Sequence, residues 1–229
     1  MPGAPDDEAA LLGLPPGAFA RADEAADALF YQPTRLVTHV DDGAIAAVTR
    51  LYRELFPAGG DVLDLMSSWV SHLPAEVAYR RVVGLGMNPV ELDANPRLHE
   101  RVVQDLNARP ALPFGDAEFD GAAICVSVQY LIRPVAVLRE VARVLRAGAP
   151  LVVAFSNRCF PSKAVAIWRA LDDAGHVRLV ERYLAVAGGW RAVESRADRR
   201  PGGDPLLAVV AHRAGDPTDT QATRGVSVR

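Results

Sequence analysis

Residues 112–157 read LPFGDAEFDGAAICVSVQYLIRPVAVLREVARVLRAGAPLVVAFSN, and this stretch decides the predicted fold. It opens with an apolar run at 119–128. A segment with helical periodicity follows, beginning at Pro134 and reaching Gly148, a residue suited to end a helix. A second apolar run occupies 150–156. Two continuous apolar strands joined by a crossover helix predict parallel neighbours in a sheet that is covered on both faces.

The same alternation of apolar runs and helical segments extends outward from this stretch. Segments between the first five runs are long enough for crossover helices, and the last two runs are joined by a turn-rich link typical of a hairpin. The fold class is therefore predicted as α/β: a Rossmann-like seven-stranded mostly parallel sheet with helices on both faces and a C-terminal antiparallel hairpin strand. The five further runs are DVLDLM at 61–66, RRVVGLG at 80–86, RVVQDL at 101–106, WRAVESRA at 190–197 and PLLAVVAHR at 205–213.

An N-terminal helical cap is expected before the first strand, with helices over 23–31 and 41–56. Residues 1–20 are rich in proline and glycine, which predicts a mobile or loosely docked arm. Helices are also predicted over 162–173 and 176–186. We expect one compact domain, consisting of an arm and cap at 1–57, a Rossmann-like part at 58–214 and a disordered tail at 215–229.

Composition narrows the classes of function. The chain has 229 residues, a net charge of −3 and a pI near 6.0, so it lacks the basic field that binds nucleic acid or anionic lipid. Cys125 and Cys159 are too few for a cysteine-based metal site or a disulfide framework, and no metal is expected. Lys163 is the single lysine, which argues against Schiff-base chemistry. With no signal peptide and no long apolar run, the protein is expected to be cytoplasmic; its oligomeric state stays open.

The chain from about Asp61 to His212 resembles the class I S-adenosylmethionine-dependent methyltransferases, in particular the small-molecule enzymes of the methyltransferase type 11 kind. In that family an LPF–acidic–FD stretch leads into the fourth strand and an EVxRVLxxGGxL stretch leads into the fifth. Both occur within 112–157, with Ala149 in place of the second glycine. The resemblance implies S-adenosylmethionine as the cofactor, bound at the carboxyl ends of the strands.

Two departures from the family pattern lie at the expected cofactor site. The family follows its first strand with DxGxGxG, whereas residues 64–70 read DLMSSWV without a glycine. An acidic residue usually follows the second strand, and here Asn88 and Glu91 are the candidates to take its place. We expect a divergent branch that still binds the cofactor; the alternative is a scaffold that has lost it. The resemblance places at the cofactor Asp64, Met66, Ser67, Ser68, Gly86, Met87, Asn88, Asp105, Leu106 and Ser127.

The acceptor site is expected to include the segment before the first strand, which in the family folds over the cofactor. Tyr31 and His39 lie there, and His39 is the first choice for a general base because imidazole takes up a proton near neutral pH. The alternative is that His39 only caps or packs at the start of the next helix. Asp41 is a candidate for substrate binding, although Asp41 or Asp42 also fits the N-cap of that helix.

The remaining acceptor candidates follow the first, fourth and fifth strands. His72 is expected to face either the cofactor's carboxylate or solvent. Gln129 and Tyr130 belong to a Ser-x-x-Tyr spacing that only weakly resembles the motif of amino-methylating relatives, and Tyr130 is grouped with His39 and Tyr31 as catalytic. Arg158 is expected either to meet an acidic acceptor or to be a surface residue.

The leading interpretation is methyl transfer from S-adenosylmethionine to an O, N, S or activated C atom of a small molecule, by in-line displacement. A second interpretation is a non-methylating reaction on the same scaffold, such as a cyclisation or an elimination, because fold does not determine function. A third is a non-catalytic binding or regulatory subunit. No nucleic acid or membrane partner is expected.

Overall fold

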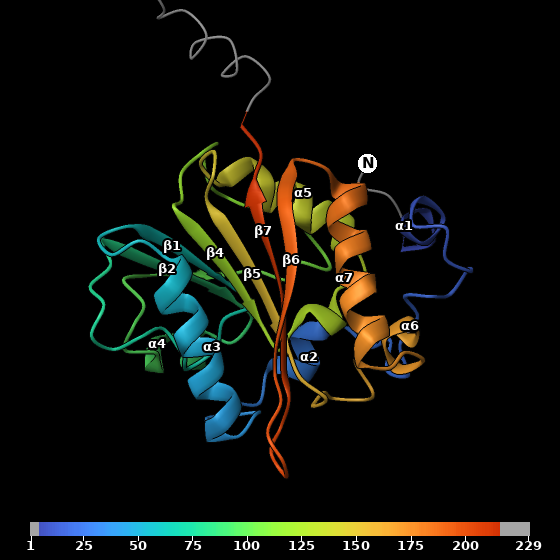
Figure 1. The fold of residues 1–229 in the computed structure, drawn as a ribbon. Coiled ribbons are helices and arrows are strands. Elements are labelled where there is room, and N and C mark those ends of the chain that lie inside the picture. Colours follow the sequence, from blue (N-terminus) through green and yellow to red (C-terminus); the bar gives the residue numbers. More distant parts are fainter. Residues whose placement is uncertain (1–4, 216–229) are drawn as a thin grey trace, which may run out of the picture.

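Seven strands form a single sheet in the computed structural model, which describes residues 5–215 (Figure 1). The spatial order is β3-β2-β1-β4-β5-β7-β6. The first five strands run parallel, and β7 pairs antiparallel with both β5 and β6, as the sequence predicts. The strands are β1 (Asp61–Leu65), β2 (Arg81–Gly86), β3 (Glu100–Val103), β4 (Gly121–Cys125), β5 (Pro150–Phe155), β6 (Trp190–Asp198) and β7 (Leu206–Arg213).

Helices cover both faces of the sheet, and alternate strand residues point to opposite covers. Leu63 packs into the cluster built with α1, α5 and α7, whereas Val62 packs into the cluster built with α3. The central strands are buried on both sides, so most of their residues are apolar; Asp61 and Asp64 in β1 are the buried exceptions there. The helices are α1 (Pro5–Leu11), α2 (Asp27–Tyr31), α3 (Asp42–Leu55), α4 (Pro89–Ala94), α5 (Pro134–Val144), α6 (Ala166–Arg169) and α7 (Asp173–Ala187).

The expectation of a mobile or loosely docked arm at 1–20 is wrong for its described part, residues 5–20. Leu12 and Phe19 are buried in the core. The Glu8 carboxylate accepts hydrogen bonds from the backbone N–H groups of Val135 (2.8 Å) and Ala136 (2.9 Å). These amides belong to the first turn of α5, which has no partners for them within the helix. The arm therefore docks by capping α5 from a distant part of the chain.

Three predicted elements differ from those observed. The helix expected at 23–31 is confined to α2, and only the short α6 occupies the middle of 162–173. Among the described residues, the link 66–80 between β1 and β2 contains no helix. Instead α3 covers that face of the sheet, through Val48 and Tyr52. The predicted disordered tail lies, apart from Gly215, outside the described residues.

Candidate functional site

A cavity of about 320 Å³ opens where the carboxyl ends of β1 to β4 meet, and residues 27–39 and 158–160 enclose it from the other side. Its position follows from topology, because β1 and β4 are neighbours whose connections leave the sheet in opposite directions. The cavity is lined by fifteen of the seventeen residues that sequence reasoning assigned to the site: Tyr31, His39, Asp64, Met66, Ser67, Ser68, His72, Gly86, Met87, Asn88, Asp105, Leu106, Ser127, Tyr130 and Arg158.

The turn after β1 contains no glycine, whereas the family uses glycines to form a tight turn at this place. Met66 has a φ of 55°, in the left-handed region that favours glycine. Gly86 at the end of β2 permits close approach, because a Cβ there would lie 2.2 Å from the Ser67 carbonyl oxygen. The Ser67 N–H donates to the Leu85 carbonyl (2.8 Å), which holds the two strand ends together. Close backbone packing thus depends on the glycine of the neighbouring strand.

Asp64 forms the floor of the cavity at the end of β1. Its carboxylate Oδ2 accepts hydrogen bonds from the hydroxyls of Ser67 and Ser71, each at 2.6 Å. The Asn95 amide donates in turn to Ser71 Oγ (2.9 Å). Burial raises the pKa of Asp64 to about 6, and the two hydroxyl hydrogen bonds oppose that rise. The floor is therefore an ordered polar network with a carboxyl group that titrates close to neutral pH.

The ends of β3 and β4 present polar groups that suit a nucleoside. Asp105 Oδ1 accepts from the N–H groups of Asn107 (2.8 Å) and Ala108 (3.2 Å), which fixes the loop in place. Ser127 Oγ is buried and has no hydrogen-bond partner, although it lines the cavity. A buried unpartnered hydroxyl is costly unless a ligand or water satisfies it. Both features fit a bound S-adenosyl group, whose adenine and ribose carry donors and acceptors.

Asn88 and Glu91 follow β2, and both side chains line the cavity while holding hydrogen bonds to neighbouring segments. Asn88 Oδ1 caps α4 by accepting from Val90 N (3.0 Å), and its amide donates to the Tyr31 carbonyl (3.0 Å). Glu91 accepts from Ser68 Oγ (2.6 Å) and from Arg35 N (2.7 Å). These side chains therefore tie the N-terminal segment to the strand ends.

Two histidines lie together at the cavity. The His39 ring stands edge-on to Phe160, with centroids 5.3 Å apart, so His39 packs across the cavity and not on α3. His72 has a φ of 54°, and its carbonyl accepts from Thr49 Oγ1 on α3 (2.9 Å). Burial lowers the pKa of both imidazoles, and the proximity of His39 lowers that of His72 further. Both rings are therefore neutral near pH 7 and able to accept a proton.

Tyr31 and Tyr130 contribute protonated hydroxyl groups. Burial raises the pKa of Tyr31 well above its usual range and that of Tyr130 to about 12. The Tyr130 hydroxyl accepts from Phe160 N (2.8 Å). At neutral pH these side chains bind and orient, and they do not act as bases.

Asp41 and Gln129 do not line the cavity. Asp41 is the N-cap of α3, where its Oδ1 accepts a hydrogen bond from Ala44 N (2.8 Å). Helix capping accounts for an acidic residue at this position, so no role in substrate binding is needed to explain it. Gln129 is buried, and its amide donates to the Val126 carbonyl (2.9 Å). Arg158 lines the cavity but is mostly exposed and paired with Asp204 at 2.8 Å.

Sequence reasoning missed several lining residues. Phe160 lies after β5, two residues beyond Arg158, the last residue predicted at that strand end. Trp69 follows β1 but is not among the predicted site residues; its Nε1 donates to the Val37 carbonyl (3.0 Å) and so holds the N-terminal segment. Asp27 enters the cavity from α2, and no sequence signal indicates this. Within residues 5–215 we find no cluster of side chains suited to a metal ion and no helix long and apolar enough to cross a membrane.

Comparisons with known proteins agree with this architecture. Residues 67–153 match the family model described as a methyltransferase domain. The solved structure of the [4+2]-cyclase SpnF has a TM-score of 0.57 and 16% identity, with 80% of this chain and 90% of that chain covered. A SAM-dependent methyltransferase from Aquifex aeolicus has a TM-score of 0.52 and 16% identity, covering 75% and 90%. A TehB-like SAM-dependent methyltransferase from Corynebacterium glutamicum ATCC 13032 has a TM-score of 0.50 and 18% identity, covering 76% and 89%.

No curated protein matches the sequence. The solved structures share the fold at low identity, and the family match covers the β1 loop through most of β5. Together they confirm the resemblance to class I S-adenosylmethionine-dependent methyltransferases and the Rossmann-like fold, and they support S-adenosylmethionine as the cofactor.

Proposed function

We propose that the protein transfers a methyl group from S-adenosylmethionine to a small molecule enclosed between the strand ends and residues 27–39. The observation that carries this proposal is the unpartnered, buried Ser127 hydroxyl in a cavity whose Asp105 loop is already ordered. A pocket of about 320 Å³ lies within the range of small-molecule sites. The cavity suits a nucleoside with a small acceptor better than a macromolecule.

The cofactor, when bound, supplies a methyl group on a sulfonium centre. Asp105, Leu106 and Ser127 would hold the nucleoside, because they follow the strands that receive it in the family. Met66 and Ser67 would approach its amino-acid portion, since the β1 turn brings backbone groups into the cavity there. In-line displacement then depends mainly on alignment of the acceptor.

His39 is the proposed general base, and His72 and Tyr31 are the proposed orienting groups. A neutral imidazole accepts the proton of a hydroxyl or thiol acceptor as that atom attacks, or removes a proton from an ammonium acceptor before the free amine attacks. The packing of His39 against Phe160 fixes the ring, and the Thr49 hydrogen bond fixes the backbone of His72. Tyr31 remains protonated and can donate a hydrogen bond to the acceptor.

A second candidate is a reaction on the same scaffold without methyl transfer. The similarity to SpnF supports this second candidate, because that structure is described as a [4+2]-cyclase and shares this fold at a TM-score of 0.57. In this case the cofactor would act as a bound structural or electrostatic group. Product mass separates the two candidates, since only methylation adds carbon to the acceptor.

Calorimetric titration with S-adenosylhomocysteine tests the cofactor site. We expect binding by the wild type and a Kd raised about tenfold or more by Asp105→Ala, because a hydrogen bond to a charged group contributes about 1.5–3 kcal/mol. Asp93→Ala, on the exposed side of α4, is the matched control and should bind as the wild type does. No binding at millimolar ligand would refute the proposal, and binding without product methylation across an acceptor panel would favour the second candidate.

A further inference from the structure

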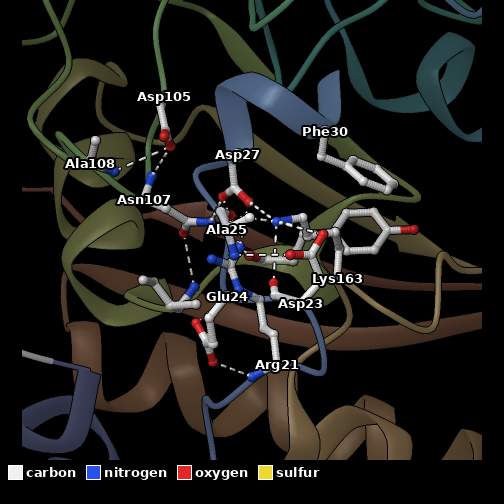
Figure 2. Close-up of polar contacts among 12 residues, drawn as sticks. Arg21, Asp23, Glu24, Ala25, Asp27, Phe30, Asp105, Asn107, Ala108 and Lys163 are labelled. Carbon is white, nitrogen blue, oxygen red and sulfur yellow. Dashed lines mark hydrogen bonds and ion pairs between the residues drawn. The ribbon is translucent and has the colours of Figure 1, made fainter. Parts of the chain in front are cut away.

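A buried group of charges adjoins the cavity at Asp27, and Figure 2 shows the polar contacts within this group. Its centre is Lys163, the chain's single lysine, whose side chain is 0% exposed. Lys163 Nζ is 3.2 Å from Asp27 Oδ1 and 3.3 Å from Asp23 Oδ2, and it donates to the Ala25 carbonyl (2.6 Å). Lysines are almost never fully buried unless they are paired with an acidic group, so the burial of Lys163 depends on its acidic partners.

Asp27 gathers three partners from separate parts of the chain. Arg21 Nη1 donates to both carboxylate oxygens (2.6 and 2.8 Å), and Asn107 Nδ2 donates to Oδ2 (2.8 Å). Burial acts to raise the pKa of Asp27, but the hydrogen bonds from Arg21, Asn107 and Lys163 and the charge of Arg21 outweigh it and lower the pKa. The carboxylate is therefore ionised and depends on all three partners.

Asn107 carries the connection to the cofactor side. Its amide also donates to the Tyr130 carbonyl (2.9 Å), and its Oδ1 accepts from Ile132 N (2.9 Å). Its backbone N–H donates to Asp105 Oδ1 (2.8 Å), as Figure 2 shows. One side chain thus joins the loop after β3 to the segment after β4 and to Asp27.

Helix α2 carries the connection to the acceptor side. Asp27 is its first residue, and Tyr31, its last, lines the cavity. Phe30 stands edge-on to Tyr31 (5.0 Å) and to Phe160 (5.3 Å), while Lys163 Nζ lies 5.5 Å from the Phe30 ring. A shift of Asp27 must therefore move the aromatic wall of the acceptor site.

We propose that Lys163 and Asp27 are positioning residues that couple the cofactor loop at Asp105 to the acceptor wall at Tyr31. The physical reason is that a buried ion pair with shared hydrogen bonds has few alternative arrangements, so its members move as a unit. A ligand bound at Asp105 and Leu106 thereby helps to hold α2 in place through Asn107. This inference rests on the proposed function only for the identity of that ligand.

Hydrogen exchange of the unliganded full chain is the first test, with Lys163→Met as the variant and Arg50→Met as the control. Arg50 also has an acidic partner, Asp198, but it lies exposed on α3. Lys163→Met should speed exchange about tenfold or more at 24–31 and also at 105–108, which Lys163 does not contact. An increase confined to 23–27 and 160–165 would overturn the coupling. If Lys163→Met does not fold, Asp27→Asn gives the same comparison while retaining the side-chain volume.

The second test adds S-adenosylhomocysteine. In the wild type it should slow exchange at both 105–108 and 24–31, whereas in Lys163→Met it should still slow exchange at 105–108 but no longer at 24–31. A merely structural lysine would leave both effects in a folded variant, which would refute the inference. Failure of the wild type to bind the probe would count against the proposed function alone, because the unliganded comparison decides the coupling independently.

Discussion

Replacement of the buried Asp64 by asparagine should flatten the pH dependence of stability. Burial raises the pKa of Asp64 from 3.8 to about 6 in the folded protein. The folded state therefore binds a proton more tightly than the unfolded state does. The stabilisation from that proton is fully present below about pH 4 and is lost as the pH rises through about 6.

The magnitude follows from the shift. About two pKa units correspond to about 3 kcal/mol, of which about 1–2 kcal/mol is lost between pH 5 and pH 8. Asparagine keeps an oxygen that can accept from Ser67 and Ser71 but has no proton to lose. The free energy of unfolding of Asp64→Asn relative to the wild type should therefore rise by about 1–2 kcal/mol from pH 5 to pH 8.

Urea unfolding at the two pH values measures this difference. Other titrating groups, among them His39 and His72, contribute equally to both proteins and cancel. Asp42→Asn, at an exposed position at the start of α3, is the control and should follow the wild type at both pH values. Parallel pH curves for Asp64→Asn and the wild type would show that burial does not raise the pKa of Asp64, and the reasoning would be refuted.

Three further outcomes are expected. Gly86→Ala should raise the Kd for S-adenosylhomocysteine about tenfold or more, because the new Cβ displaces the Ser67 carbonyl; unchanged calorimetric affinity would show that this approach is unimportant. His39→Gln should lower kcat by about 10²-fold or more with little change in cofactor affinity. The wild type should lose rate in acid as His39 takes up a proton, and this loss should be absent from the pH profile of the variant; a retained acid limb would assign the base elsewhere. Glu8→Ala should lower the free energy of unfolding by about 1–2 kcal/mol in urea titrations, because two amides at the start of α5 lose their acceptor; wild-type stability would contradict the capping role.

Most of the sheet could be predicted from sequence because the central strands are short, mainly apolar runs with a clear end, whereas the edge strand β6 is exposed and largely polar. Val62 and Leu63 are both buried, on opposite faces, and this continuous pattern is what a doubly covered parallel strand requires. The strand ends then located most of the cavity lining, since topology brings them to one edge. The link 66–80 was not predictable in the same way, because α3 covers the sheet in place of a crossover helix and lies earlier in the chain.

The errors at the site have local physical causes. Asp41 lies two residues from His39, but its side chain caps α3 and so turns away from the cavity. Gln129 adjoins Tyr130, yet its amide hydrogen-bonds to the backbone three residues back. The place of Asp27 at the cavity could not be predicted, because its partners Arg21, Asn107 and Lys163 come together only in the folded chain. Short-range competition for hydrogen bonds and long-range charge pairing are both invisible to spacing arguments.

The link between β1 and β2 has a consequence for how this site can change by mutation or engineering. Residues outside the link donate hydrogen bonds to its backbone carbonyl groups. Asn95 donates to Ser68 O, and Thr49 donates to His72 O. Arg97 donates to the carbonyls of Pro74 and Val77. A glycine-rich loop grafted from a relative would satisfy these donors only if its backbone carbonyls occupied the same positions. Insertions that most surface loops tolerate should be rejected here. The segment and its three donor residues therefore form one structural unit, and transplantation of the site to another scaffold would need all of them.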